Sequence, residues 1–151
     1  RRIARISHRA TRFHYDLHFH PLLSDKLYET WIEKSCQGYA DCVLVADVRG
    51  TPTGYISCHL GDHGEGRIGL MGVSSDFGGQ GLGQLLVNAS LRWFAENGSR
   101  RVSVVTQGRN FKAQRLYQKC GFLTCSIQLW YHYWLHRENR KRTHDRYSDP
   151  V

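Results

Sequence analysis

Apolar side chains recur every three or four positions in three segments, which predicts amphipathic helices at residues 24–38, 82–97 and 110–121. Their apolar stripes consist of Leu27, Tyr28, Trp31 and Ile32 in the first helix, of Leu82, Leu85, Leu86, Ala89 and Trp93 in the second, and of Ala113, Leu116, Tyr117 and Cys120 in the third. Residues that favour helix ends bound them: Ser24 or Asp25 and Asn110 as caps at the start, and Gly38, Gly98 and Gly121 as stops.

Runs rich in β-branched and aromatic residues lie between and beyond these helices and predict strands. We expect strands at residues 42–46, 55–58, 67–73 and 102–106, and a final pair of strands within residues 122–135. A turn that contains Gly and Pro at residues 49–54 makes the first two strands a β-hairpin. Residues 1–20 alternate only weakly, and we interpret them as a first strand or loop. The order of elements predicts an α/β (α+β) fold in which helices flank a mixed sheet.

The formal net charge of +8 is concentrated near the two ends of the 151-residue chain. Residues 1–12 hold five arginines and no acid, and residues 137–151 hold five basic and three acidic side chains. Residues 13–136 carry eleven basic and ten acidic residues, so this part is nearly neutral. Since stacking and groove-reading motifs are also absent, we expect no nucleic-acid partner. We expect one domain over residues 1–136 and a basic C-terminal tail over residues 137–151.

The cysteine and hydropathy patterns narrow the class of protein further. The five cysteines form an odd number without a C-x-x-C pair, so the sequence contains neither a disulfide framework nor a zinc knuckle. No apolar run approaches the ~20 residues that a membrane-spanning helix needs, and no signal-peptide pattern opens the chain. These features predict a cytoplasmic protein without a membrane partner. Because the chain does not begin with Met, we expect a segment upstream of residue 1.

A strand, a glycine-rich loop and a long helix follow one another, an arrangement that binds phosphate groups. The loop reads Gly78-Gly79-Gln80-Gly81-Leu82-Gly83. Its glycines let the backbone approach a ligand, and free amides at the helix start point at an anion. No Lys-Ser or Lys-Thr pair follows Gly83, which argues against a P-loop, and the glycine spacing with no acid ending the next strand argues against a dinucleotide fold. For the loop alone, a tight turn without a ligand remains the alternative.

A second motif follows the loop further along the chain and reads Asn110-x-x-Ala113-x-x-Leu116-Tyr117-x-x-x-Gly121-Phe122. The two motifs, in this order and spacing, resemble the GNAT acetyltransferase superfamily over roughly residues 40–136. The resemblance implies a mixed, mainly antiparallel sheet flanked by helices. It also implies an N-acetyltransferase that uses acetyl-CoA to acetylate a small-molecule amine.

The same resemblance implies roles for residues of both motifs. In the family, the loop that corresponds to Gly78, Gly79, Gln80, Gly81, Leu82 and Gly83 binds the pyrophosphate of coenzyme A. The segment that matches Met71, Gly72 and Val73 hydrogen-bonds the pantetheine arm through its backbone, and Asn110, Ala113 and Tyr117 lie along the other side. The family favours Arg or Gln where this chain has Gly78, so we expect weaker cofactor binding through the remaining backbone amides.

Three further segments look like a narrower group of acetyltransferases. They are Ser24-x-x-Leu27-Tyr28-x-x-Trp31-Ile32, Arg67-Ile68-Gly69-Leu70 and Tyr133-Trp134-Leu135. They resemble the nucleotide-sugar amine acetyltransferases, in particular the dTDP-fucosamine (dTDP-4-amino-4,6-dideoxygalactose) N-acetyltransferase group. This resemblance implies a nucleotide-sugar acceptor and an additional N-terminal region, and a homodimer is a candidate assembly.

Acetyl transfer requires an uncharged amine, a stabilised oxyanion and a proton for the departing thiolate. Tyr117 is the candidate acid by analogy with the tyrosine that the family has at this place. Packing of Tyr117 beside Leu116 in the core is the alternative interpretation. The backbone amides of residues 71–73 are the candidate oxyanion donors.

The sequence leaves the general base open, because the position where many relatives carry a carboxylate lies close to Arg67. The candidate bases, acting directly or through water, are His59, His63, Glu65 and His132. A structural or exposed role is the alternative for each histidine. Arg67 and His132 are candidate substrate-binding residues, with an ion pair to Glu65 or Asp62 as the alternative role of Arg67. No pair of the nine histidines shows a metal-ligand motif, so we expect no metal.

Two other functions fit the same resemblance. The first is a GNAT domain that binds acyl-CoA without turnover, which fits the presence of Gly78 where the family favours Arg or Gln. A protein or peptide N-acetyltransferase would need an open groove in place of a closed sugar pocket.

Overall fold

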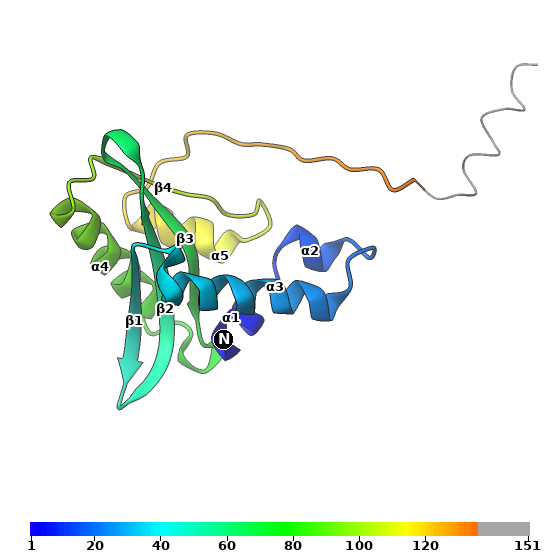
Figure 1. Cartoon of the computed structure of the whole chain (residues 1–151), viewed down its shortest axis with the longest axis horizontal. Helices are drawn as coiled ribbons and strands as arrows, with labels where there is room; N and C mark the ends of the chain where they lie inside the picture. Colours follow the sequence, from blue (N-terminus) through cyan, green and yellow to red (C-terminus); the bar gives the residue numbers. More distant parts are fainter. Residues whose placement is uncertain (136–151) are drawn as a thin grey trace, which may run out of the picture.

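The computed structural model describes residues 1–135, in which four strands form one sheet in the order β1-β2-β3-β4 (Figure 1). The strands are β1 (Cys42–Val48), β2 (Thr51–Leu60), β3 (Glu65–Val73) and β4 (Arg101–Val104). The first three pair antiparallel and β3 pairs parallel with β4, so the predicted mixed, mainly antiparallel sheet is confirmed. The tail predicted at residues 137–151 lies outside the described residues.

The hairpin between β1 and β2 follows from its turn residues. The φ angle is 53° at Arg49 and 78° at Gly50, the primed geometry that matches the twist of two antiparallel strands. Asp47 stabilises the turn because its Oδ1 accepts a hydrogen bond from the amide of Gly50 at 2.7 Å.

A β-bulge in β3 changes the sheet face on which its side chains lie. Strands β2 and β3 are paired through Ile56–Met71 and Cys58–Ile68, so β3 has one extra residue between these pairs. Ile68 and Leu70 are two positions apart, yet Ile68 belongs to one hydrophobic core and Leu70 to the other. The extra residue therefore lies at residues 69–70.

Strand β4 accompanies β3 over only part of its length. The parallel pairing joins Glu65–Ile68 to Arg101–Val104 and ends there. The bulge begins at the next residue, Gly69, and a bulge bends its strand. Residues 69–73 of β3 consequently continue with one edge unpaired by β4, while their other edge pairs with β2.

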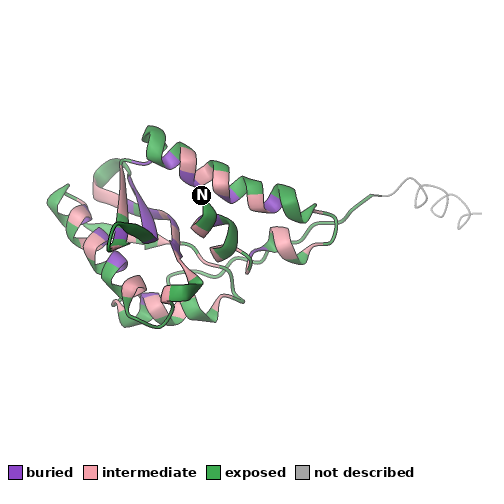
Figure 2. Cartoon of the chain, turned by 90° about the horizontal axis from the view of Figure 1, so that it is seen from below, coloured by how far each residue is buried: buried purple, intermediate pink, exposed green. Residues whose placement is uncertain are grey.

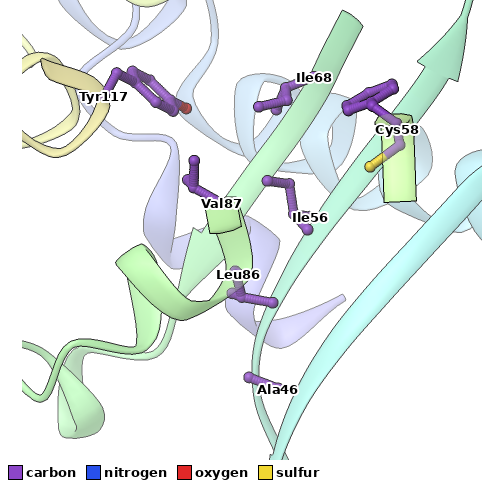
Figure 3. Packing of buried hydrophobic residues seen from close by; sticks show 8 residues of the cluster. Ala46, Ile56, Cys58, Ile68, Leu86, Val87 and Tyr117 are labelled. Atoms are coloured by element: carbon purple, nitrogen blue, oxygen red, sulfur yellow. The ribbon is translucent and has the colours of Figure 1, made fainter. Parts of the chain in front are cut away.

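Helices cover both faces of the sheet (Figure 1). They are α1 (Arg2–Ser7), α2 (Arg12–Tyr15), α3 (Pro21–Lys34), α4 (Leu82–Glu96) and α5 (Phe111–Lys119), with short helical turns η1 (Ser35–Tyr39), η2 (Asp62–Gly64) and η3 (Ser75–Phe77). Helices α4 and α5 pack on one face, around the fully buried Ile56 and Val87 (Figure 3). Phe94 is fully buried in the same core. Helices α1 and α3 cover the other face, where Tyr28 and Leu70 are buried. The buried positions accordingly lie on the strands and on the sides of α3 and α4 (Figure 2).

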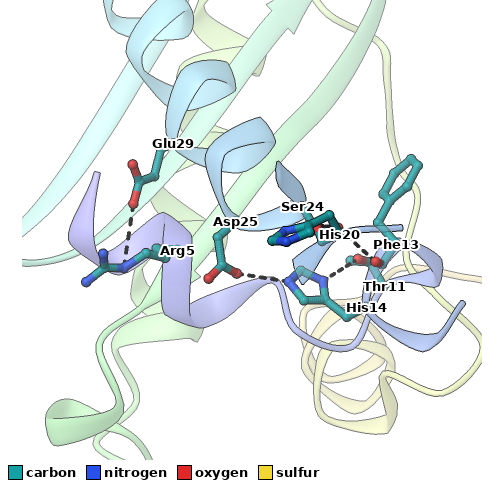
Figure 4. Close-up of polar contacts among 8 residues, drawn as sticks. All are labelled: Arg5, Thr11, Phe13, His14, His20, Ser24, Asp25 and Glu29. Atoms are coloured by element: carbon teal, nitrogen blue, oxygen red, sulfur yellow. Dashed lines mark hydrogen bonds and ion pairs between the residues drawn. The ribbon is translucent and has the colours of Figure 1, made fainter. Parts of the chain in front are cut away.

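Polar contacts hold the N-terminal helices against α3 (Figure 4). The contacts are Arg5 to Glu29 at 3.6 Å, His14 to Asp25 at 3.0 Å, and Ser24 Oγ donating to the carbonyl of Phe13 at 2.8 Å. The interpretation of residues 1–20 as a first strand or loop is therefore wrong, since α1 and α2 lie there. Tertiary contacts, with Ala4 fully buried against α3, outweigh the weak local pattern.

Two details of the predicted helices also need correction. Helix α3 begins at Pro21 with His20 as its N-cap, so Ser24 and Asp25 lie inside the helix, where they bind α2 instead of capping. Proline suits the first position of a helix because it has no amide to satisfy there. In α4 the residues that are buried are Leu86, Val87, Ser90 and Phe94, and the predicted core residue Leu85 is 57% exposed.

The final pair of strands predicted within residues 122–135 is wrong. Residues 123–135 form neither strand nor helix, and nearly all of their large apolar side chains are exposed. An alternating run becomes a strand only where a neighbour supplies its hydrogen bonds, and β4 is just four residues long. The end of the segment instead contacts the turn after α2, where Trp134 Nε1 donates to Asp16 Oδ2 at 2.9 Å. None of the helices within residues 1–135 combines the length and apolar character needed to cross a bilayer.

Candidate functional site

The glycine loop leads directly into α4 and leaves the start of this helix uncovered. Gly79 and Gly81 have φ angles of 78° and 80°, which glycine adopts without strain, and Gly81 is the N-cap. No side chain of the described residues caps the first turn, and this turn contains no acid. A Cβ atom built on either glycine would meet nothing within 4 Å. The loop before α4 is thus exposed and its first amides have no side-chain cap among the described residues, which leaves them available to an anion.

Three elements meet at Gly83, the last glycine of the loop. A Cβ atom at this position would lie 3.1 Å from Cδ2 of Leu116 in α5 and 3.4 Å from Cε of Met71 in β3. Glycine thus permits α4 to approach both elements closely. The predicted cofactor-binding segments, which are far apart in the sequence, are brought together here.

Residues 71–73 lie on the part of β3 that β4 does not accompany. Their pairing with β2 joins Met71 to Ile56 and Gly72 to Tyr55. Gly72 is buried, and a Cβ atom there would lie 3.0 Å from the Ser7 hydroxyl of α1. Amides alternate between the two edges of a strand, so this segment presents backbone groups at its unpaired edge.

Tyr117 in α5 points its hydroxyl at the same part of β3. The side chain is 9% exposed, packs against the ring of Phe122 and places its hydroxyl 4.0 Å from Sδ of Met71. Burial raises the pKa of Tyr117 to about 12, so the hydroxyl keeps its proton at neutral pH. Tyr117 thus lies in the core, as the alternative interpretation has it, and also holds a proton beside the end of β3.

Asn110 and Ala113 begin α5. The side-chain oxygen of Asn110 accepts a hydrogen bond from the amide of Ala113 at 3.2 Å, so Asn110 caps this helix as its sequence position predicts. Ala113 is half-buried beside the core of the α4 face. The cap fixes where α5 starts, and with it the position of Tyr117 two turns later.

A second group of polar residues lines a pocket of about 270 Å³ at the other end of β3. The lining residues are His59, Leu60, Gly61, Glu65, Gly66, Arg67 and Ser103. Arg67 is paired in register with His59 of β2 and with Ser103 of β4, so three strands contribute to this pocket. Glu65 forms an exposed ion pair with Arg101 at 2.8 Å. The ion pair between Arg67 and Glu65, which was one alternative role for Arg67, is therefore not formed.

His59 differs from the other candidate bases in its surroundings. It is 8% exposed, and its Nε2 atom has no hydrogen-bond partner among the described residues. Burial, together with the charge of Arg67, lowers the pKa of His59, while Asp41 and the backbone of Tyr39 act in the opposite direction. The ring is therefore neutral at physiological pH.

The remaining candidate bases lie elsewhere. His63 is exposed on η2, and Glu65 is engaged with Arg101. His132 contacts Asp16 at 3.1 Å and does not line the pocket of Arg67, so the two predicted substrate-binding residues are not brought together. Within residues 1–135, no three His, Cys, Asp or Glu side chains are grouped as a metal site. All five cysteines are free.

Sequence reasoning missed two residues of this region, Gly69 and Ser103. Gly69 lies at the bulge, and a Cβ atom there would come within 2.5 Å of His59 Nε2. A glycine inside an otherwise buried strand is a signal of a bulge or of close approach, and it was available in the sequence. Ser103 carried no such signal because its place beside Arg67 depends on the register of β3 and β4.

Comparison with known proteins gives a consistent result for most of the chain. Residues 4–122 match the acetyltransferase (GNAT) family. A dTDP-fucosamine acetyltransferase of Escherichia coli O6:H1 is 30% identical over 119 residues, which cover 78% of this chain and 49% of that protein. The spore coat polysaccharide biosynthesis protein SpsD of Bacillus subtilis is 27% identical over 136 residues, covering 90% of this chain and 47% of SpsD. The chain thus spans about half the length of these curated relatives.

Among solved structures, the aminoglycoside N-acetyltransferase AAC(6')-Iy in complex with CoA has a similar fold. The TM-score is 0.60 at 18% identity, over 73% of this chain and 88% of that one. At this identity the similarity concerns the fold alone.

Proposed function

Since this chain belongs to the acetyltransferase (GNAT) family, we propose that it transfers the acetyl group of acetyl-CoA to a primary amine. The observation that carries the proposal is the meeting of three elements at one place. The open start of α4, the unpaired edge of β3 and the hydroxyl of Tyr117 lie around Met71 and Gly83. An anion site, backbone donors and a proton donor are the groups that acetyl transfer from a phosphate-bearing thioester requires.

The loop of residues 78–83 is the proposed site for the pyrophosphate of coenzyme A. The amides at the start of α4 and the positive end of its dipole favour negative charge, and no side chain competes for them in the described residues. The space around Gly79 and Gly81 fits a bulky anion. The backbone of residues 71–73 then binds the pantetheine arm at the edge that β4 leaves free.

Tyr117 is the proposed proton donor for the departing sulfur. Acetyl-CoA supplies an activated acyl group, and the sulfur that leaves carries a negative charge. A thiol has an unperturbed pKa of ~8.5, so the thiolate needs only a nearby proton and no strong acid. The raised pKa of Tyr117 keeps a proton on the hydroxyl throughout the neutral range.

The proposed acceptor is the amino group of a nucleotide sugar. Support comes from the name of the E. coli relative, which is 30% identical to this chain. The Arg67 guanidinium in its pocket offers a donor for a substrate phosphate, the group that a nucleotide sugar brings. His132 lies near α2 and remains a second, separate candidate for binding the substrate.

A thiol-release assay with several amines tests the proposal. The panel contains dTDP-4-amino-4,6-dideoxygalactose, an aminoglycoside and a peptide with a free N-terminus, each at neutral pH with acetyl-CoA. We expect free thiol to appear only with an amine present, and fastest with the nucleotide sugar. Binding of coenzyme A without thiol release for any amine would instead support a non-catalytic acyl-CoA-binding domain.

A further inference from the structure

We propose that His59 is the general base, and that its Nε2 atom takes the proton from the acceptor amine at the point where β3 and β4 separate. This inference rests on the proposed acetyl transfer and supplies the residue that the sequence left open. It is carried by the burial of the ring, its unpartnered Nε2 atom and its position over Gly69.

The unpartnered nitrogen is the first observation. His59 is 8% exposed, and Nε2 has no hydrogen-bond partner among the described residues. A buried polar atom without a partner costs stability, so such atoms are rare unless a ligand or a reaction uses them. The residue itself is among those that line the pocket of Arg67.

The other ring nitrogen determines which form of the imidazole is present. The ring of His59 packs edge-on against the ring of Tyr39, with the two centroids 5.4 Å apart. Action as a base at Nε2 requires the neutral tautomer that carries its proton on Nδ1, because Nε2 then keeps its lone pair.

The position of Nε2 links it to the reaction site. A Cβ atom on Gly69 would lie 2.5 Å from Nε2, so the ring covers the residue directly after the last pair of β3 and β4. Met71, which contacts the hydroxyl of Tyr117, is two residues further, or about 7 Å along a strand. His59 shares the sheet face of Tyr55, with α1 and α3, whereas Tyr117 belongs to the core with α4. Base and acid thus flank the unpaired edge of β3 from opposite sides.

The charged groups around His59 favour its neutral form. Arg67 of β3 lies beside it and lowers its pKa, in the same direction as burial. Asp41, before β1, and the Tyr39 backbone raise the pKa by smaller contributions. Glu65 also lines the pocket, but its carboxylate binds Arg101. The base is consequently available at pH 7 and is lost only as the pH falls below the ordinary histidine range of ~6.5.

The protons of the reaction balance with these two residues. The acceptor enters as an ammonium group, and Nε2 of His59 removes one proton and passes it to solvent. The nitrogen lone pair then forms a bond to the thioester carbon, the carbon–sulfur bond breaks, and sulfur keeps the electron pair and takes the hydroxyl proton of Tyr117. The second nitrogen proton restores Tyr117. The products are one amide, one thiol and one released proton.

The pH dependence of a His59→Gln variant tests this role. Gln keeps the size and polarity of the side chain without its basicity. With dTDP-4-amino-4,6-dideoxygalactose as the probe, we expect kcat/KM at pH 7 to fall by roughly 10²-fold. The loss should shrink to less than about tenfold near pH 9.5, because the amine then loses its proton in solution. A loss that is equal at all pH values would mean a structural role and would overturn the proposal.

A second measurement does not depend on the acceptor. Nitrogen NMR of histidine-labelled protein at pH 7.5 should show His59 as the neutral tautomer with the proton on Nδ1. A proton on Nε2, or a charged ring, would overturn the proposal even if no acceptor has been found. Failure of the proposed function is seen separately, as absence of thiol release by the wild type. The control is His20→Gln, an exposed histidine at the start of α3, which should keep the wild-type rate and pH profile.

Discussion

At the scale of single residues, the hydroxyl of Tyr117 can be tested apart from its ring. Tyr117→Phe removes the proton donor and keeps the aromatic packing against Phe122. We expect kcat to fall by roughly 10²–10⁴-fold, the usual contribution of general-acid catalysis, with KM for acetyl-CoA changed only a few-fold. Steady-state kinetics of both proteins with the same amine provide the comparison. A variant that retains more than about half the wild-type kcat would show that Tyr117 only packs.

The two catalytic candidates show what a sequence can predict about single residues. Tyr117 belongs to a motif with fixed spacing, so its place near the glycine loop could be anticipated. His59 was one of four candidate bases because nothing local separates it from His63 or His132. Its burial and its free Nε2 atom depend on how β2 packs beside the bulge of β3, which is a tertiary property.

At the scale of elements, the start of α4 tests the proposed cofactor site. Gly81→Asp places a negative charge at the N-cap, where it repels a pyrophosphate and also caps the amides that should bind it. We expect coenzyme A affinity to fall by at least about 100-fold in calorimetry, which corresponds to ~2.7 kcal/mol.

Gly81→Asn is the matched control for this charge. Asn has nearly the same shape and tolerates the left-handed conformation of Gly81, where φ is 80°. We expect the Asn variant to bind coenzyme A more tightly than the Asp variant. Unchanged affinity in a folded Gly81→Asp protein would remove the basis for placing the pyrophosphate at this loop.

The segment of residues 123–135 is held through Asp16. Its carboxylate accepts from Trp134 Nε1 at 2.9 Å and contacts His132 at 3.1 Å. A hydrogen bond from the backbone of His18 is the largest cause that lowers the pKa of Asp16 to about 2, and the contacts with Trp134 and His132 act in the same direction. Asp16→Ala should therefore release the segment. We expect several-fold faster amide hydrogen exchange at residues 130–135, with exchange in β2 unchanged. Equal exchange in both proteins would indicate that ring contacts hold the segment, among them the stacking of Trp134 on His18 and its edge contact with Phe19.

The sequence predicted elements best where local pattern and tertiary pairing agree. The hairpin, the glycine loop and α5 with its Asn110 cap lie where expected. The strands expected within residues 122–135 are absent because alternation cannot show whether a neighbouring edge is available to pair with. The early start of α3 was missed because the residues before Ser24 are mostly exposed apolar side chains, which blur the periodicity.

At the scale of the whole molecule, His8 links the stability of the fold to pH. Burial, with the nearby charge of His14 as a smaller cause, lowers the pKa of His8 from 6.5 to about 4. Its ring stacks on Tyr28, and its Nε2 lies 2.8 Å from the Tyr55 hydroxyl. Between these pH values the unfolded chain binds more protons than the folded one, so stability falls as the pH drops from about 6.5 to 4. The contribution of one such group is about 3 kcal/mol at most.

Urea unfolding of wild type and His8→Gln at pH 7.5 and 4.5 measures this contribution. Gln retains an acceptor for Tyr55 and does not titrate. We expect the wild type to lose more unfolding free energy between these two pH values than the variant does. Equal losses would show that folding does not lower the pKa of His8.

Acetyl transfer to an amine releases one thiol for each amide formed, so product stoichiometry tests the proposed function. The 151-residue chain is incubated with acetyl-CoA that carries a labelled acetyl group and with dTDP-4-amino-4,6-dideoxygalactose, and then free thiol and labelled amide are quantified by mass spectrometry. We predict equal amounts of thiol and N-acetylated sugar, both absent without protein. Thiol that appears without any acetylated amine, or no turnover with any amine although coenzyme A binds, would contradict this account.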